Sequence, residues 1–269
     1  MTCLFAHTSL VYRLKRGLPA VAALIFLMLF WQMAAILFHI PSYTLPSPAD
    51  IAAVMIERWR DLLVNGWITL IESAAGLALS IVVAIPLGIA IVYSPLVERI
   101  FYPFLIASQA IPKVALAPIL VVWFGFGLLP KVLIAFFIAF FPIVVNTVVG
   151  MSRTPADMIH LMRSLGASSL QILVRVQLPS ASPYIFAGIK VASAFAVVGA
   201  IVGEFIAANS GLGYLQLLAD NNLQIPLLFG TLVVLSIMGI ALFYFVALVE
   251  MLILPRPLRE VRTDGEATL

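Results

Sequence analysis

Six long apolar stretches make up about half of this chain of 269 residues. They total 139 residues but contain only 5 of its 27 Lys, Arg, Asp and Glu residues. A helix needs about 20 mostly apolar residues to cross the hydrocarbon core of a membrane, and each stretch is of that order. The stretches are 18–38, 67–92, 101–123, 132–149, 183–207 and 227–252. The sequence therefore predicts an all-α membrane protein with six transmembrane helices.

The composition excludes several other classes of protein. Charged residues make up 10% of the chain and hydrophobic residues 63%, whereas soluble domains contain roughly 25% charged residues. A water-soluble enzyme and a disordered chain are therefore both excluded. The net charge of +3 is too small to indicate a nucleic-acid partner. The single cysteine, Cys3, rules out an internal disulfide and a cysteine metal cluster.

The basic residues predict how the chain is oriented. Lys and Arg collect in short cytoplasmic loops. With the N-terminus inside, the inner segments hold ten basic residues and the outer segments hold three. Both ends of the chain are basic, which requires an even number of spans. We therefore expect a multi-pass protein of the cell membrane with cytoplasmic tails at 1–17 and 255–269.

The outer segment 39–66 leaves two interpretations open. After a proline-rich turn, Asp50 can cap a short helix with an apolar side and a charged side, which is typical of a helix lying along the membrane surface. A simple connector between the first two spans is the alternative.

The one long inner loop, 151–182, contains signals for two short helices. The stretch 154–157 (Thr-Pro-Ala-Asp) combines a capping hydroxyl, a first-turn proline and an acid, which predicts a helix start. Gly166 predicts the end of this helix, because glycine adopts the left-handed conformation easily. The stretch 168–171 (Ser-Ser-Leu-Gln) is a capping box that starts a second helix, and Pro179 is expected to end it. The loop is therefore predicted to be a helix, a glycine corner and another helix that do not cross the membrane.

Each of these short helices has one apolar side. The apolar residues are Ile159, Met162, Leu165, Leu170, Leu173 and Val174. An apolar surface on the cytoplasmic side of a membrane needs another surface to cover it. A partner protein and the chain's own transmembrane bundle are both candidates. The two are compatible, because one side can pack on the bundle while the exposed tip docks on a partner.

Four polar residues inside the predicted spans are candidates for a translocation path. Ionisable residues at this depth are costly and usually face a cavity or each other. Lys113 lies near mid-depth between two prolines, where a lysine can attract an anionic solute or pair with an acid or a carbonyl for structure. Glu72 and Glu204 fall near the outer third, where a structural role is favoured. Asn146 can hydrogen-bond across helices.

The sequence contains no motif for catalysis or for metal binding. The three histidines are far apart, in a tail and two loops. The phosphate-binding pattern Gly-x-x-x-x-Gly-Lys-Ser/Thr is absent. The chain is therefore predicted to have no ATP site and no resident cofactor. An ATP-driven process would require another chain.

The inner loop and the start of the fifth span contain the motif Leu165-Gly166-Ala167-Ser168 with Leu178-Pro179, Pro183 and Gly188. This arrangement resembles the cytoplasmic coupling loop of the inner-membrane permease subunits of binding-protein-dependent ABC importers. Further motifs point to the nitrate, sulfonate, taurine and thiamine-precursor branch of these permeases. They are Leu45–Pro48, Ile111–Pro118, Trp123–Gly125, Phe141–Ile143 with Asn146-Thr147, and Gly203–Phe205 with Gly211–Tyr214. The resemblance covers residues 41–254.

This resemblance implies a type I ABC importer permease, with two copies of the chain forming the solute path in a bacterial inner membrane. Two ATP-hydrolysing subunits would dock from the cytoplasm, and a periplasmic or lipid-anchored protein would deliver the solute. The solute would be a small anion such as a sulfonate, taurine or nitrate, with a thiamine pyrimidine precursor or a riboflavin-like compound as the alternative. The docking surface for the ATPase would comprise Asp157, His160, Leu161, Met162, Leu165, Gly166, Ala167 and Ser168.

One part of the family's loop motif is missing. The family's Glu-Ala-Ala run is replaced here by His160-Leu161-Met162. A charged contact through that glutamate is therefore not implied, whereas docking by shape and apolar contact is.

Two other classes of protein are less consistent with the sequence. A secondary transporter usually contains two repeats of spans around broken helices, and no internal duplication is visible in this chain. An intramembrane enzyme needs a nucleophile or a metal constellation at depth, and the sequence contains neither.

Overall fold

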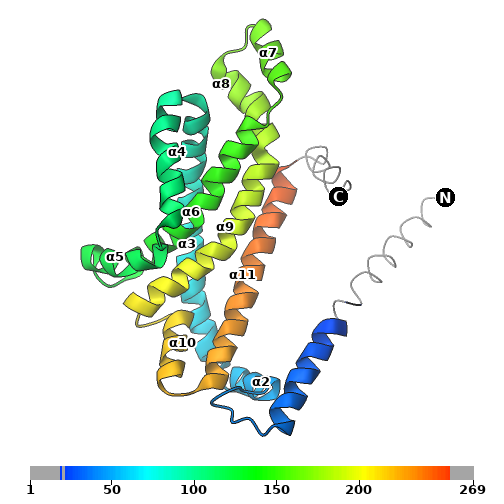
Figure 1. Cartoon of the computed structure of the whole chain (residues 1–269), viewed down its shortest axis with the longest axis vertical. Coiled ribbons are helices and arrows are strands. Elements are labelled where there is room, and N and C mark those ends of the chain that lie inside the picture. The colour runs from blue at the N-terminus through cyan, green and yellow to red at the C-terminus, as the bar shows by residue number, and fades with distance from the viewer. Residues whose placement is uncertain (1–18, 20–21, 255–269) are drawn as a thin grey trace, which may run out of the picture. The chain divides into compact units, whose positions relative to one another are not determined.

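The computed structural model describes residue 19 and residues 22–254. The two predicted tails lie outside the described residues, and their cytoplasmic orientation stays a prediction. The described chain folds mainly into helices (Figure 1). It divides into two units. Within the described residues, unit 1 comprises residue 19 and the segments 22–62 and 216–232, and unit 2 comprises the segments 63–215 and 233–254.

Four of the described helices are long and apolar enough to cross a membrane. They are α3 (Trp59–Tyr93), α6 (Leu128–Ser152), the continuous helix Ser169–Ala207 and α11 (Ile225–Ile253). These helices contain the second, fourth, fifth and sixth predicted spans. A shorter apolar helix, Ala22–Leu37, lies within the first predicted span. Four spans are therefore confirmed as long apolar helices, and the total of six stays a prediction.

The third predicted span, 101–123, is wrong as a continuous helix. Helix α4 (Pro95–Ala110) ends before Pro112, and a 3-10 turn (Lys113–Leu116) then leads into the short helix α5 (Ala117–Phe124). The break falls here because a proline ring disfavours the helical conformation in the preceding residue. That residue has φ −76° and ψ 125°, which is extended backbone.

The second helix of the inner loop does not end at Pro179. Helix α8 (Ser169–Ile172) passes through a π turn (Leu173–Gln177) directly into α9 (Leu178–Ala207). A proline in a helix clashes with the carbonyl four residues before it. For Pro179 this carbonyl lies in the π turn, where the coil is wider than in an α-helix. The predicted loop 151–182 is therefore continuous with the fifth span.

The helix expected in the outer segment is present as α2 (Pro48–Glu57). Ser47 caps it by accepting a hydrogen bond from the N–H of Asp50, and the Asp50 carboxylate accepts from the N–H of Ser47 at 3.1 Å. Asp50 is therefore the second half of a capping box rather than the cap itself. The helix begins three residues earlier than expected.

Unit 1 is held together by contacts of α2 and the start of α11 with the first apolar helix. The ring of Trp31 lies 6.0 Å from that of Phe229. The side-chain oxygen of Gln32 accepts a hydrogen bond from the N–H of Ala49 at 3.1 Å. The first apolar helix therefore contacts both segments of unit 1, through Ala49 in the first segment and Phe229 in the second.

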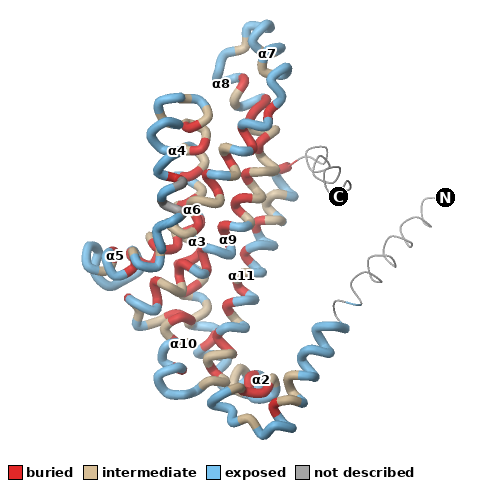
Figure 2. Tube along the Cα trace, in the orientation of Figure 1, coloured by how far each residue is buried: buried red, intermediate tan, exposed pale blue. Residues whose placement is uncertain are grey.

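The core of unit 2 is built on the packing of α6 against α9 (Figure 2). Small residues allow this packing. A Cβ atom on Gly199 would lie 2.5 Å from the Cα of Ala135, and a Cβ on Gly203 would lie 2.9 Å from the Cα of Lys131. Glycine and alanine at such positions let membrane helices approach closely. The two helices therefore form a close-packed pair that carries the polar groups described below.

Candidate functional site

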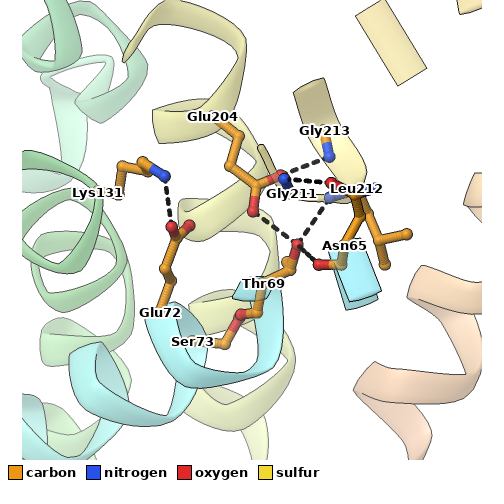
Figure 3. Close-up of polar contacts among 9 residues, drawn as sticks. All are labelled: Asn65, Thr69, Glu72, Ser73, Lys131, Glu204, Gly211, Leu212 and Gly213. Carbon is orange, nitrogen blue, oxygen red and sulfur yellow. Dashed lines mark hydrogen bonds and ion pairs between the residues drawn. The ribbon is translucent and has the colours of Figure 1, made fainter. Parts of the chain in front are cut away.

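A buried polar cluster joins α3 and α9 to the corner before α10 (Leu212–Asn221) (Figure 3). Its centre is the buried carboxylate of Glu204. The Thr69 hydroxyl donates to Oε1 of this carboxylate at 2.6 Å, and the N–H of Gly213 donates to Oε2 at 2.5 Å. The oxygen of Thr69 also accepts a hydrogen bond from the N–H of Leu212 at 2.8 Å. Both oxygens of Glu204 therefore bind groups of the chain itself.

The corner at Gly211 fits closely around this carboxylate. Gly211 has φ +113°, a backbone conformation that favours glycine. A Cβ atom there would lie 2.2 Å from Oε1 of Glu204. The N–H of Gly211 donates to the side-chain oxygen of Asn65 at 2.8 Å. In the sequence, the spacing of Glu204 and Gly211 is known only as part of a family motif. The structure gives a physical reason for the glycine, because a larger residue at this position would collide with the carboxylate.

A buried ion pair lies beside this cluster. Nζ of Lys131 donates to Oε1 of Glu72 at 2.5 Å, and both side chains are buried. Oε2 of Glu72 has no hydrogen-bond partner among the described residues. From the sequence, Lys131 counts among the three outer basic residues, so this partner was missed. Glu72 itself carries the signal that could have found it, because a carboxylate inside a span needs a cation nearby.

Lys113 and Asn146 lie at a different place, on a cavity of about 420 Å³ in unit 2. The ammonium of Lys113 lies 4.6 Å from the centre of the Phe141 ring. Nδ2 of Asn146 donates to the carbonyl of Pro142 in its own helix at 2.8 Å, rather than across helices. The remaining lining residues are Ile138, Val145 and Phe195.

The four predicted path residues therefore fall into two sets. Glu204 belongs to the buried cluster and Glu72 to the ion pair beside it, whereas Lys113 and Asn146 line the cavity. The role of all four in a solute path stays a prediction.

The glycine corner of the inner loop is confirmed. Helix α7 (Ala156–Ser164) ends two residues before Gly166, which follows the cap residue and has φ +78°. The N–H of Gly166 donates to the carbonyl of Arg163, and the N–H of Ala167 donates to the carbonyl of Met162, both at 3.0 Å. These two bonds form a Schellman motif, which satisfies the free carbonyls at a helix end.

The start of α8 is confirmed and the predicted cap of α7 is wrong. Ser168 and Gln171 form the expected capping box. Thr154 does not cap α7, because Pro155 lies at the cap position, and the Thr154 hydroxyl has no partner in the described part of the chain. The proline fixes a conformation that leads into the helix without a side-chain hydrogen bond.

Most of the predicted docking residues are exposed. Met162 and Ala167 are half-buried, and the exposed ones are Asp157, His160, Leu161, Leu165, Gly166 and Ser168. The loop is also attached to the end of α3, because the Tyr93 hydroxyl donates to the side-chain oxygen of Gln177. The loop therefore presents an apolar tip while its base contacts a long membrane helix.

Comparison with known proteins decides the family. The family described as binding-protein-dependent transport system inner membrane component matches residues 76–259. The chain belongs to this family. The resemblance to permease subunits, first recognised in the sequence motifs, is therefore confirmed. The chain is an inner-membrane component of an ABC transport system and a multi-pass membrane protein.

Two relatives match this permease over most of their length. It is 37% identical over 246 residues to the formylaminopyrimidine transport permease protein ThiX of Halalkalibacterium halodurans, which covers 90% of this chain and 98% of that protein. It is also 37% identical over 243 residues to the riboflavin transport system permease protein RibX of Chloroflexus aurantiacus, which covers 88% of each. These names give no support to the narrower expectation of a sulfonate, nitrate or taurine permease.

A solved structure shares the fold. A chain of the MetNI methionine ABC transporter in an inward-facing conformation superposes on the permease with a TM-score of 0.65. The match covers 74% of the permease and 99% of that chain, at 18% sequence identity. At this identity the likeness shows the fold of an ABC transporter membrane chain and nothing about the solute.

Proposed function

We propose that this permease is the membrane-spanning subunit of a type I ABC importer. Two copies form the solute path, separate cytoplasmic subunits bind and hydrolyse ATP, and a solute-binding protein outside the membrane delivers the solute. The family match over residues 76–259 supports the class of machine. The observation that carries the proposed coupling is the exposed helix, glycine corner and helix of the inner loop.

The exposed tip of this loop is the proposed docking surface for the ATPase subunit. Leu161 and Leu165 are both exposed at this corner, and exposed apolar patches mark sites of interaction. The Schellman motif at Gly166 fixes the direction in which both helices leave the tip. The surface is thus a preformed apolar corner suited to a groove in a partner.

The proposed mechanism transmits movement from this corner to the membrane helices. Closure of the ATPase subunits around ATP moves the loop. The movement reaches α9 because α8 continues into it, and it reaches α3 through the contact of Tyr93 with Gln177. The second to sixth spans then alternate between inward-open and outward-open states.

For the solute we propose a small nitrogen heterocycle. The names of the two relatives support this class, because one is a formylaminopyrimidine permease and the other a riboflavin permease. A small inorganic or sulfonated anion is the second candidate, because Lys113 places a cation on a cavity of unit 2.

Co-purification with the ATPase subunit tests the docking proposal. We expect Leu165→Asp to reduce recovery of the ATPase subunit roughly tenfold or more, since about 1.4 kcal/mol corresponds to a factor of ten and burying an unpaired charge costs more. Ile56→Asp is the matched control, because Ile56 on α2 is 75% exposed and Leu165 is 73% exposed. Equal recovery with both variants would contradict docking at this corner.

A further inference from the structure

Lys113 differs from the two other lysines of the membrane helices. Lys131 is paired with Glu72, and Lys190 is paired with Glu250. Lys113 makes no ion pair with any described carboxylate, and its ammonium lies over the face of the Phe141 ring. A cation inside a membrane without an acid is costly unless it faces water or a ligand. The face of the Phe141 ring attracts this cation, but the described chain supplies no anionic partner for it, so the lysine is available to an anionic group of a ligand.

The backbone around Lys113 also differs from that of a spanning helix. The chain leaves α4 before Pro112 and continues as a 3-10 turn from Lys113 to Leu116. Broken backbone at membrane depth is tolerated only where it is buried in protein or lines a water-filled cavity. Phe141, which contacts the lysine, lies near the middle of the 25-residue helix α6. The ammonium of Lys113 therefore lies level with the middle of α6. The break in the helix at this depth is tolerated because the broken backbone lines a cavity.

The cavity at this break offers three kinds of contact. The Lys113 ammonium supplies positive charge, and the rings of Phe141 and Phe195 supply flat apolar surface. The amide of Asn146 supplies an oxygen acceptor and one N–H beyond the one bonded to Pro142. Ligand sites in proteins are typically apolar cavities of about 300–1,000 Å³ with a few polar groups. The cavity of about 420 Å³ falls within this range.

We propose that this cavity is a solute-binding site of the permease that selects flat heteroaromatic compounds carrying an anionic or electron-rich oxygen group. The ring of the solute stacks on Phe195 and Phe141, and the oxygen group accepts from Lys113. The proposal rests on the proposed import function and adds a selective site within the membrane. The same cavity can recognise both proposed classes of solute, because Lys113 binds the anionic group and the aromatic rings bind the heterocycle.

Binding of two flavins to the purified chain in lipid nanodiscs tests this site. Riboflavin and flavin mononucleotide share the same fused ring system and ribityl chain, and only the second carries a phosphate. Binding is followed through quenching of flavin fluorescence, without binding protein or ATPase. We expect the wild-type chain to bind flavin mononucleotide roughly tenfold more tightly than riboflavin, because charge-assisted hydrogen bonds are the strong ones.

Variants of the lysine and of one ring separate the two contacts. We expect Lys113→Met to remove the preference for flavin mononucleotide and Lys113→Arg to keep it. We expect Phe195→Leu to weaken both flavins at least roughly fivefold, since stacking on an aromatic side chain contributes appreciably. Phe205→Leu is the matched control, because Phe205 lies on the same helix and is 42% exposed, against 43% for Phe195.

Four results would overturn the proposal. The first is the absence of saturable flavin binding by the wild-type chain. The second is an unchanged preference for flavin mononucleotide in Lys113→Met. The third is equal effects of Phe195→Leu and Phe205→Leu. The fourth is displacement of flavin mononucleotide by an equal concentration of methanesulfonate, which would show a bare anion site without ring recognition. Failure of the import proposal is distinguishable, because the wild-type chain would then not co-purify with an ATPase subunit whatever its flavin binding.

Discussion

Replacing Thr69 by valine removes one hydroxyl at the centre of the buried cluster. This hydroxyl donates to Oε1 of Glu204 at 2.6 Å and accepts from the N–H of Leu212 at 2.8 Å. Thr69, Glu204 and Leu212 are all buried, so water does not replace the lost partner readily. Valine has nearly the shape of threonine, and the change is therefore one of hydrogen bonding.

The expected magnitude follows from the two bonds. A buried hydrogen bond between neutral groups contributes about 0.5–1.5 kcal/mol, and the largest contributions of side-chain bonds between membrane helices are about 1.7 kcal/mol. We therefore expect Thr69→Val to lower the free energy of unfolding by about 1–3 kcal/mol. Thr69→Ser keeps the hydroxyl and is expected to restore most of this loss.

Equilibrium unfolding in mixed detergent micelles measures this difference. Thr147→Val is the matched control, because Thr147 is equally buried but its hydroxyl donates only to the carbonyl of Ile143 in its own helix. We expect the control to lose no more than about 0.6 kcal/mol, because its bond lies within one helix and about 0.6 kcal/mol is the average for side-chain bonds between membrane helices. If Thr69→Val were no less stable than Thr147→Val, the cluster would not hold the corner at Leu212, and the reasoning would be refuted.

Three further predictions concern other parts of the permease. Lys131→Met should lower the free energy of unfolding by about 3–5 kcal/mol, because it leaves Glu72 unpaired, and adding Glu72→Gln should recover part of this loss. Additive losses of the two substitutions in the same unfolding assay would argue against a coupled pair. Gly166→Val should lower the solute imported per ATP hydrolysed while membrane insertion is kept, because a β-branched residue is strained at φ +78°; an unchanged ratio would remove the corner from coupling. Gly203→Leu should prevent α6 from packing on α9, since its Cβ would lie 2.9 Å from the Cα of Lys131, and a native-like melting temperature would contradict this.

The apolar stretches predicted the long helices because length and charge scarcity are properties of a segment by itself. Four predicted spans lie within long helices of the described chain. The error in the third span has a local cause, since the apolar stretch continues across Pro112 whereas helix α4 ends before this proline. The continuation through Pro179 depends on a π turn, and the sequence carries no distinct signal for such a turn.

The inner loop was predicted better than the polar cluster, because its structure is also set by local features of the sequence. Gly166 and the capping box at Ser168 form hydrogen bonds only within one helical turn, so the neighbouring residues are enough to predict them. The partner of Glu72 lies 59 residues away, and that of Glu204 on α3 lies 135 residues away. Such pairs depend on how the helices pack, and this packing cannot be predicted from the spacing of residues in a single sequence.

Uptake by liposomes containing the reconstituted transporter tests the central claim most directly. The permease is combined with its ATPase subunit and its solute-binding protein, and accumulation of the solute held by that binding protein is measured with and without ATP. We predict accumulation only when ATP, an intact ATP site in the partner subunit and the binding protein are all present. Movement of the solute down an ion gradient by the purified chain alone would contradict the account.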